Sequence, residues 1–202
     1  MNDEYKTIES PSEGIYKEKG SKFLAFAYPV YSIDEIKEIV AKINKDYYDA
    51  RHRCYAWKLG LDENNFRAND DGEPSGTAGK PIYGQLLSHE LTNILVVVVR
   101  YFGGIKLGTS GLIYAYKTAT ADAIANATII SKTVNDYYTV CFSYEAMNDV
   151  MKVIKDDNVD VRGQEFDLQC KLKIVMRKSA MEKTKEKLEK ITSVKLYFDG
   201  SF

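Results

Sequence analysis

The sequence lacks the features of secreted, membrane-spanning or metal-stabilised proteins. It has 202 residues and three cysteines, an odd number with no CxxC pair, which argues against a disulfide framework and a structural zinc site. No segment reaches the roughly 20 apolar residues of a spanning helix. Residues 1–10 are polar and do not resemble a secretory signal. We therefore expect a soluble protein of the reducing cytoplasm that makes no membrane contact.

The sequence also lacks an excess of charge of one sign. Its 28 Lys+Arg and 29 Asp+Glu give a formal net charge of -1, so no overall positive field attracts nucleic acid or anionic lipid. Any RNA binding must therefore depend on a local patch, and DNA binding is not expected. A hydrophobic content of 45% is enough for ordinary packed cores in one large domain or two small ones.

The most ordered local pattern lies at residues 94–116. Residues 94–99 are apolar and, except for Leu95, β-branched, which predicts a strand buried on both faces and ending at Arg100. A glycine loop follows, and Ser110 is a candidate cap for the helix after it. Free amides at a helix start attract anions, but the loop lacks the P-loop and G-x-G-x-x-G patterns. Specific nucleotide binding is therefore not expected.

Periodicity in the amino-terminal part predicts a mixed α+β domain. Two strands with a turn near Gly20 precede a helix that begins with the capping box of Ser32 and Glu35 and ends near Asn44. A strand at 54–61, a long exposed loop at 62–80 and a short helix at 81–89 follow.

The pattern of apolar and polar residues changes at residues 131–135, where we place a short linker. We expect domains at 1–132 and 133–202. In the second domain, strands at 137–144, 159–166, 168–176 and 194–198 and two helices give the order βαββαβ. That order predicts a ferredoxin-like arrangement with both helices on one face of the sheet.

A constellation of polar residues gives the first candidate site. Carboxylates on the 62–80 loop, with the imidazole of His52, can in principle hold a metal and activate water. Adjacent carboxylates commonly point apart, however, so we predict no metal and no cofactor and assign no catalytic residue. The candidate ligand-binding residues are Asp70, Asp71, Glu73, Ser75, Thr77, Arg100, Tyr101, Gly103, Gly104, Lys106 and His52. The alternative is a purely structural role, in which Arg100 pairs with Asp70, Asp71 or Glu73.

The outer face of the second domain's sheet is the second candidate site. Basic and aromatic side chains alternate there with apolar ones, as on platforms that bind single-stranded RNA. The candidate nucleic-acid-binding residues are Lys171, Lys173, Arg177, Lys195 and Tyr197. The simpler alternative is an ordinary solvated face.

Two segments together resemble the signature of the IMPACT/YigZ family. They are DDGEPSGTAGKPI at residues 70–82 and VVRYFGGIKLG at residues 98–108. RHRCYAW at 51–57 and SKFLAFAYPV at 21–30 add to the resemblance, which covers roughly residues 14–130. The remaining part resembles the carboxy-terminal domain of bacterial YigZ-type members.

The resemblance implies a fold and a broad role. It implies an amino-terminal domain similar to domain 2 of a small-subunit ribosomal protein, and a carboxy-terminal domain similar to ferredoxin-like domains of elongation factor G. Eukaryotic IMPACT proteins regulate translation by competing for the activator of a starvation-responsive initiation-factor kinase, so translation is the theme that transfers.

We therefore expect a non-enzymatic regulator of translation whose partner is the ribosome, RNA or a translation factor. The alternative is a small hydrolase or phosphate-ligand-binding protein that uses Asp70, Asp71 and Glu73 with His52 and Arg100. The sequence leaves the oligomeric state open.

Overall fold

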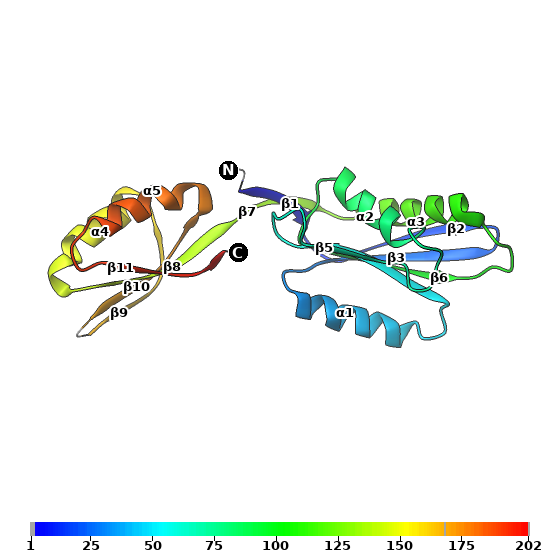
Figure 1. Cartoon of the computed structure of the whole chain (residues 1–202), viewed down its shortest axis with the longest axis horizontal. Coiled ribbons are helices and arrows are strands. Elements are labelled where there is room, and N and C mark those ends of the chain that lie inside the picture. The colour runs from blue at the N-terminus through cyan, green and yellow to red at the C-terminus, as the bar shows by residue number, and fades with distance from the viewer. Residues whose placement is uncertain (1–2, 168, 202) are drawn as a thin grey trace. The chain divides into compact units, whose positions relative to one another are not determined.

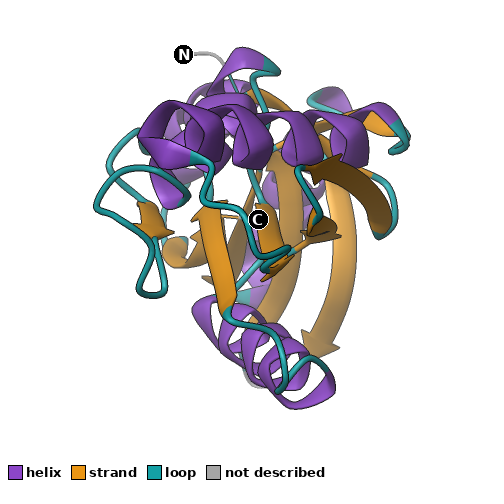
Figure 2. Ribbon diagram, turned by 90° about the vertical axis from the view of Figure 1, so that its right-hand side faces the viewer, coloured by secondary structure: helices purple, strands orange, loops and turns teal. Residues whose placement is uncertain are grey.

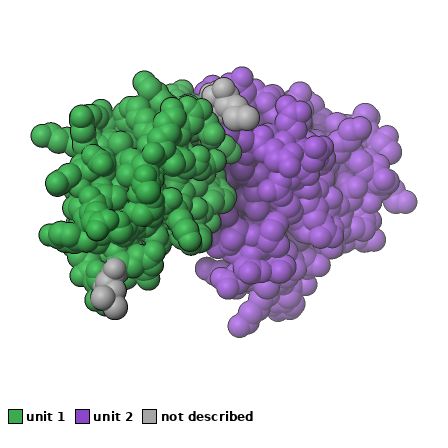
Figure 3. Space-filling model, turned by 60° about the vertical axis from the view of Figure 1, so that its left-hand side comes forward, with its two compact units in different colours: residues 1–4, 133–202 green, residues 5–132 purple. Residues whose placement is uncertain are grey.

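The computed structural model describes residues 3–167 and 169–201. The chain divides into two compact units, which Figure 3 shows in different colours. Unit 1 consists of Met1–Glu4 and Thr133–Phe202, and unit 2 of Tyr5–Lys132. Both units combine helices with a sheet, so the predicted α+β class is confirmed.

A five-stranded antiparallel sheet forms the centre of unit 2. Its strands lie in the order β2, β3, β6, β4, β5. The central strand β6 (Ile94–Tyr101) is buried from its first residue to Arg100, because the sheet is covered on both faces and β-branched side chains pack well there. The other strands are β2 (Ser12–Glu18), β3 (Ser21–Pro29), β4 (His52–Lys58) and β5 (Phe66–Asn69).

Three helices cover the two faces of this sheet (Figures 1 and 2). Helices α2 (Gly79–Ser88) and α3 (Gly108–Ala125) lie on one face. Helix α1 (Ile33–Asp46) lies on the other. Successive residues of a strand point to opposite faces, so the two faces of β3 and β6 contribute to separate apolar clusters.

The predicted cap of α1 is confirmed. The Ser32 hydroxyl accepts a hydrogen bond from the Glu35 amide at 3.2 Å. The Glu35 carboxylate in turn accepts from the Tyr31 amide at 2.6 Å, one residue earlier than in a standard capping box. The helix ends at Asp46, two residues beyond the expected end.

The first two strands of the unit 2 sheet form the predicted hairpin. Lys19 and Gly20 have φ of 46° and 78°, as in the two-residue turns that match the twist of hairpins. Gly14 lies in β2 directly against α3, because a Cβ added to it would be 2.2 Å from the Ala123 amide nitrogen. The close contact between β2 and α3 therefore requires glycine at this position.

Unit 1 is built on a four-stranded antiparallel sheet in the order β11, β8, β10, β9. Both of its longer helices lie on the same side of the sheet (Figure 1). The predicted order βαββαβ is present, whereas the names of specific sub-folds stay predictions. The elements are β8 (Asn135–Phe142), the 3-10 turn η1 (Tyr144–Ala146), α4 (Met147–Asp156), β9 (Asp160–Phe166), β10 (Cys170–Arg177), α5 (Lys178–Glu189) and β11 (Lys195–Ser201). Leu168, the first residue of a predicted strand, lies outside the described residues.

A pair of short strands was missed by the sequence patterns. Strand β1 (Glu4–Ile8) pairs with β7 (Ile129–Thr133) in a two-stranded sheet. Part of the linker predicted at 131–135 is therefore a strand. Short strands with few apolar residues lack a clear period, which explains the omission.

Two local predictions are wrong. The 62–80 loop is not wholly exposed, because it contains β5 and its Glu73 and Thr77 are buried. Ser110 does not cap α3, since it lies inside that helix and the cap residue is Leu107, with no side-chain hydrogen bond. Within residues 3–167 and 169–201, no helix is long and apolar enough to cross a membrane.

Candidate functional site

Asp70 organises the loop that joins β5 to α2. One of its carboxylate oxygens accepts hydrogen bonds from the amides of Ala78 and Gly79 at 3.0 and 2.8 Å, and the other accepts from Gly76 at 2.8 Å. An ionised carboxylate with several amide donors is stabilised where it lies. Asp70 therefore acts in the structure as an anchor for the loop.

Asp71 points away from Asp70, as adjacent carboxylates commonly do. Its carboxylate accepts from the Arg53 amide at 2.7 Å and lies 3.6 Å from the Arg53 guanidinium. Its carbonyl oxygen lies 2.7 Å from Nδ1 of His52. The backbone of Asp71 has a φ of 41°, a left-handed conformation that Asp adopts more readily than most residues. These contacts fasten the loop to β4.

Glu73 is the loop carboxylate that pairs with Arg100. The Arg100 Nη1 donates to Glu73 Oε1 at 2.5 Å, and the Tyr116 hydroxyl donates to the same oxygen at 2.8 Å. The side chains of Arg100 and Glu73 are only 7% and 3% exposed. The sequence left two roles open for Arg100, binding a ligand or pairing with a loop carboxylate. The structure contains the ion pair with a loop carboxylate.

The surroundings of this pair are aromatic and neutral. The Arg100 guanidinium lies 5.4 and 5.7 Å from the ring centres of Phe23 and Phe102, a favourable cation–π arrangement. The Cys54 sulfur lies 3.3 Å from the Tyr116 hydroxyl. Burial raises the pKa of both the Cys54 thiol and the Tyr116 hydroxyl, so both groups stay protonated at neutral pH.

The imidazole of His52 reaches only one of the three loop carboxylates. Its Nε2 lies 3.9 Å from the second oxygen of Glu73. No group of three or more His, Cys, Asp or Glu side chains within residues 3–167 and 169–201 is arranged to hold a metal. The single carboxylate beside the imidazole is already neutralised by Arg100, so the hydrolase alternative is not favoured.

The remaining predicted ligand-binding residues are scattered. Ser75 is exposed, whereas the Thr77 hydroxyl is buried and donates to the Pro74 carbonyl at 2.6 Å. Tyr101 donates to Asp49 at 2.9 Å. Gly103 packs so tightly on the β2–β3 turn that an added Cβ would be 1.9 Å from Gly20. The other two residues, Gly104 and Lys106, are exposed in the loop before α3.

Tyr116 belongs to this network but is not among the predicted site residues. In the sequence it stands at helical spacing with Leu112, Ala119 and Ala123, and in the structure it is fully buried in α3. A tyrosine within an apolar stripe of small residues indicates a buried polar partner nearby, because a buried hydroxyl needs a hydrogen-bond partner.

Four of the five predicted RNA-binding residues share the outer face of the unit 1 sheet. Helices α4 and α5 leave this face uncovered (Figure 1). Lys171 and Lys173 of β10 stand opposite Cys141 and Thr139 of β8. Lys195 and Tyr197 of β11 stand opposite the same two residues. Paired residues of antiparallel strands share a face, so three lysines and an exposed tyrosine come together. We call Lys171, Lys173, Lys195 and Tyr197 the lysine face.

Arg177 is on the same strand but is bound internally. Its guanidinium donates to both carboxylate oxygens of Asp3 at 2.7–2.9 Å and to Glu4 at 3.0 Å. By contrast, the three lysines of the lysine face have no ion pair within the described part of the chain. Beside them lies a hollow of about 250 Å³, whose lining includes Lys171, Lys173 and Arg162 and also Glu165, which stands opposite Lys171 on β9. Arg177 therefore does not belong to the lysine face.

Residues 19–124 match the Impact N-terminal domain. The chain belongs to the IMPACT family. The matched region contains the whole Glu73, Arg100 and Tyr116 network, and the lysine face lies outside it. The resemblance found in the sequence is thus confirmed.

Relatives in this family match different shares of the chain. The IMPACT family member YigZ of Escherichia coli is 37% identical over 134 residues, 65% of this chain and 66% of its own length. Protein IMPACT of Rattus norvegicus is 32% identical over 94 residues, 45% of this chain and 30% of its own length. The chain therefore spans about two thirds of the first relative and less than a third of the second.

A solved structure matches nearly the whole chain. It is a crystal structure described as that of a hypothetical protein, with a TM-score of 0.73, 28% sequence identity and 97% coverage of both chains. The fold of this chain therefore has a counterpart of almost the same extent.

Proposed function

We propose that this protein is a non-enzymatic binding protein of the translation apparatus, and that it binds single-stranded RNA through the lysine face. The observation that carries the proposal is the grouping of Lys171, Lys173 and Lys195 with exposed Tyr197 on the sheet face that α4 and α5 leave uncovered, with none of the three lysines in an ion pair among the described residues.

The chemistry of the lysine face suits a flexible phosphate backbone. Lysine offers a mobile, strongly hydrated charge that contacts phosphates without demanding one geometry. An aromatic ring exposed between such charges provides a surface on which a base stacks, at about 1–3 kcal/mol per base. Tyr197 is 53% exposed, so its ring has room for such a stack.

Family membership supports the link to translation. Eukaryotic IMPACT proteins, which this sequence resembles, regulate translation, and residues 19–124 of this chain match the Impact N-terminal domain. We extend this role to the present protein and propose that it regulates translation by binding a component of the translation apparatus. The RNA-binding face belongs to unit 1, which the Impact N-terminal domain does not include.

A binding role is favoured over hydrolysis by the contacts of Glu73. That carboxylate bonds to Arg100 and Tyr116 in a buried position, whereas a general base must reach a substrate.

The proposal is tested by fluorescence anisotropy with a labelled single-stranded 16-nucleotide RNA over a series of salt concentrations. We expect Lys171→Glu with Lys173→Glu to lower the affinity at least about tenfold. The logarithmic salt slope should also fall in magnitude by about 1.4, since each phosphate contact on a single strand contributes about 0.7.

A matched control has the same change of charge on the opposite side of unit 1. Lys152 of α4 and Lys183 of α5 are exposed on the helical layer, so Lys152→Glu with Lys183→Glu should retain the wild-type affinity. Equal losses in the two double variants, or affinity independent of salt, would contradict RNA binding at the lysine face. Cosedimentation with ribosomes should be lost in the Lys171→Glu, Lys173→Glu variant and kept in the control variant. If the Lys171→Glu, Lys173→Glu variant still cosediments, the contact with the ribosome is made through protein and not through RNA at the lysine face.

A further inference from the structure

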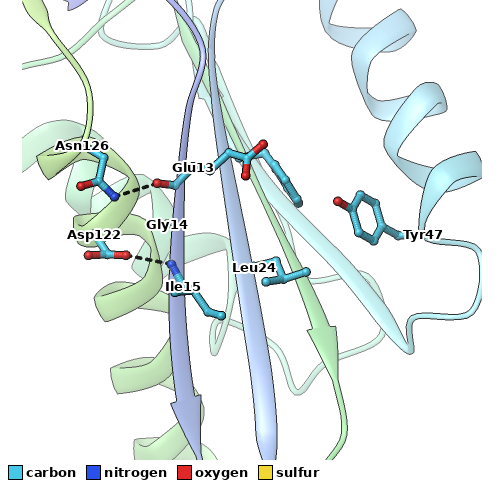
Figure 4. A pocket seen from close by; sticks show the side chains of 8 residues that line it. Glu13, Gly14, Ile15, Leu24, Tyr47, Asp122 and Asn126 are labelled. Carbon is cyan, nitrogen blue, oxygen red and sulfur yellow. Dashed lines mark hydrogen bonds between the residues drawn. The ribbon is translucent and has the colours of Figure 1, made fainter.

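Unit 2 contains a pocket at its edge strand β2, lined by residues from the α1 side of the sheet and by Asp122 and Asn126 at the end of α3. Its volume is about 300 Å³, and it lies beside the edge strand β2, the neighbouring strand β3 and the end of α1 (Figure 4). The lining residues are Glu13, Gly14, Ile15, Leu24, Phe26, Tyr47, Asp122 and Asn126. None of them belongs to the Glu73 network or to the lysine face.

The wall along β2 is fixed by hydrogen bonds to α3. The Asp122 carboxylate accepts from the Ile15 amide at 2.8 Å, and the Asn126 side chain donates to the Glu13 carbonyl at 2.8 Å (Figure 4). These bonds occupy backbone groups of an edge strand that would otherwise pair with another strand. The pocket is therefore poorly suited to an added strand, and its occupant must be recognised by side chains.

The floor of the pocket is apolar and aromatic. Leu24 and Phe26 come from β3, and the rings of Phe26 and Tyr47 have centres 5.2 Å apart. Tyr47 follows α1 directly as its C-cap residue, and its hydroxyl points toward β2 (Figure 4). Such a floor accommodates the methylene stem of a long side chain.

The rim of the pocket is acidic. Glu13 and Asp122 line it, and the lining includes no lysine or arginine. The Glu13 side chain is exposed and makes no ion pair with any residue in 3–167 or 169–201. Burial, together with the nearby charges of Glu13 and Asp46, raises the pKa of Tyr47. The local potential is therefore negative over an apolar floor.

These features select one class of ligand. An RNA phosphate would be repelled by the two carboxylates, and a hard metal ion would find more apolar surface than oxygen ligands. A cation with an apolar stem satisfies both the rim and the floor. Arginine fits better than lysine, because its planar guanidinium stacks on a tyrosine ring and bonds a carboxylate through two parallel donors.

We propose that this pocket binds an arginine side chain of a partner protein, between the Glu13 carboxylate and the Tyr47 ring. The volume suits one long side chain. The inference does not depend on RNA binding by the lysine face, because the two sites lie in different units and select ligands of opposite charge.

The test uses NMR spectra of the ¹⁵N-labelled full chain during titration with N-acetyl-arginine amide. We expect saturable shifts of the amides of Ile15, Leu24 and Tyr47. N-acetyl-citrulline amide has the same shape without the charge and should produce no such shifts. Glu13→Gln should lower the affinity for the arginine probe about fivefold or more, since a charge-assisted hydrogen bond becomes a neutral one.

Two further variants separate a local effect from a general one. Asp122→Asn removes a charge but keeps an oxygen to accept from the Ile15 amide, so it should weaken binding in a folded protein. Glu38→Gln on the exposed surface of α1 makes the same change of charge away from the pocket and should have no effect. Equal shifts with citrulline, equal affinity for N-acetyl-lysine amide, shifts centred on other residues or unchanged binding by Glu13→Gln would each overturn the proposal.

Discussion

Arg100 and Glu73 form an ion pair inside unit 2, with 2.5 Å between Nη1 and Oε1 and almost no exposure of either side chain. The pair joins the end of the central strand β6 to a loop 27 residues earlier in the chain. A buried pair of this kind contributes little net stability over an apolar pair but is costly to break. Its consequence is a loop held in one position over the sheet.

Removal of one partner of this pair should strongly destabilise unit 2. Arg100→Met leaves the Glu73 carboxylate buried without its cation, and Glu73→Gln leaves the guanidinium without its anion. We expect each variant to lose about 3–5 kcal/mol in the free energy of unfolding. Urea unfolding followed by the fluorescence of Trp57 measures this, because the only tryptophan is buried in unit 2.

The double variant Arg100→Met with Glu73→Gln supplies the control. It removes both charges, so its loss of stability should be smaller than the sum of the two single losses. Simple additivity would show that the pair does not act as a coupled unit.

Gly14→Ala and Gly84→Ala should change stability in opposite directions. At Gly14 the new methyl group would meet the Ala123 backbone at 2.2 Å, so β2 or α3 must shift, at a cost of about 1–3 kcal/mol. At Gly84, inside α2, an added Cβ meets nothing within 4 Å. We expect a gain there of about 0.5–1 kcal/mol, because alanine favours helix over glycine.

The same urea unfolding measures both glycine variants. A neutral Gly14→Ala would contradict the close packing of β2 on α3, and a destabilised Gly84→Ala would contradict the open surface of α2.

The free energy of unfolding of unit 1 should decrease at low pH, because the Asp3 carboxylate becomes protonated. Hydrogen bonds from Arg177 and Ser179 hold the pKa of the Asp3 carboxyl well below its usual range. Since the folded pKa is lower than the unfolded value of about 3.9, the stabilisation is complete above that pH and is lost as the pH falls below it. Unfolding of the wild type by urea between pH 7 and pH 2, followed by near-ultraviolet circular dichroism, should show this loss.

The variant Asp3→Asn lacks the titrating group. It should be less stable than the wild type at pH 7, and the difference should shrink as the pH falls below about 4. A constant difference across this range would show that the charge of Asp3 is not the source of its effect.

Asp70→Ala should loosen the loop before α2 without removing an exposed functional group. The amides of Gly76, Ala78 and Gly79 lose their shared acceptor, and each hydrogen bond to a charged group is worth about 1.5–3 kcal/mol. Amide hydrogen exchange at these three positions should accelerate by at least about tenfold, while exchange in β6 changes far less. Unchanged protection of the three amides would mean that the loop is held by other contacts.

Local features were predictable because their causes are local. The apolar run of β6, the Ser32 cap of α1 and the turn at Gly20 depend on residues within a few positions of one another. The βαββαβ order of unit 1 followed from its hydrophobic periods in the same way. The wrong cap at Ser110 is a local error too, because α3 begins at Gly108, two residues earlier.

The site residues could be grouped but not paired from the sequence. Asp70, Asp71 and Glu73 were equal candidates to neutralise Arg100, because three nearby carboxylates have the same chemistry. The positions of their side chains depend on how the loop folds back on β4 and β6. The loop was predicted to be exposed because it is polar, although two of its polar side chains are buried with partners.

The sequence by itself determined the α+β class, most of the helices and strands and the family, since these follow from local periodicity, capping and contiguous motifs. The tertiary structure decided that Glu73 neutralises Arg100, that Arg177 is bound by Asp3, and that Glu13, Tyr47 and Asp122 line one pocket. Those relationships join residues 27 to 174 positions apart. Contacts over such separations depend on how the sheet and helices pack, which no local pattern specifies.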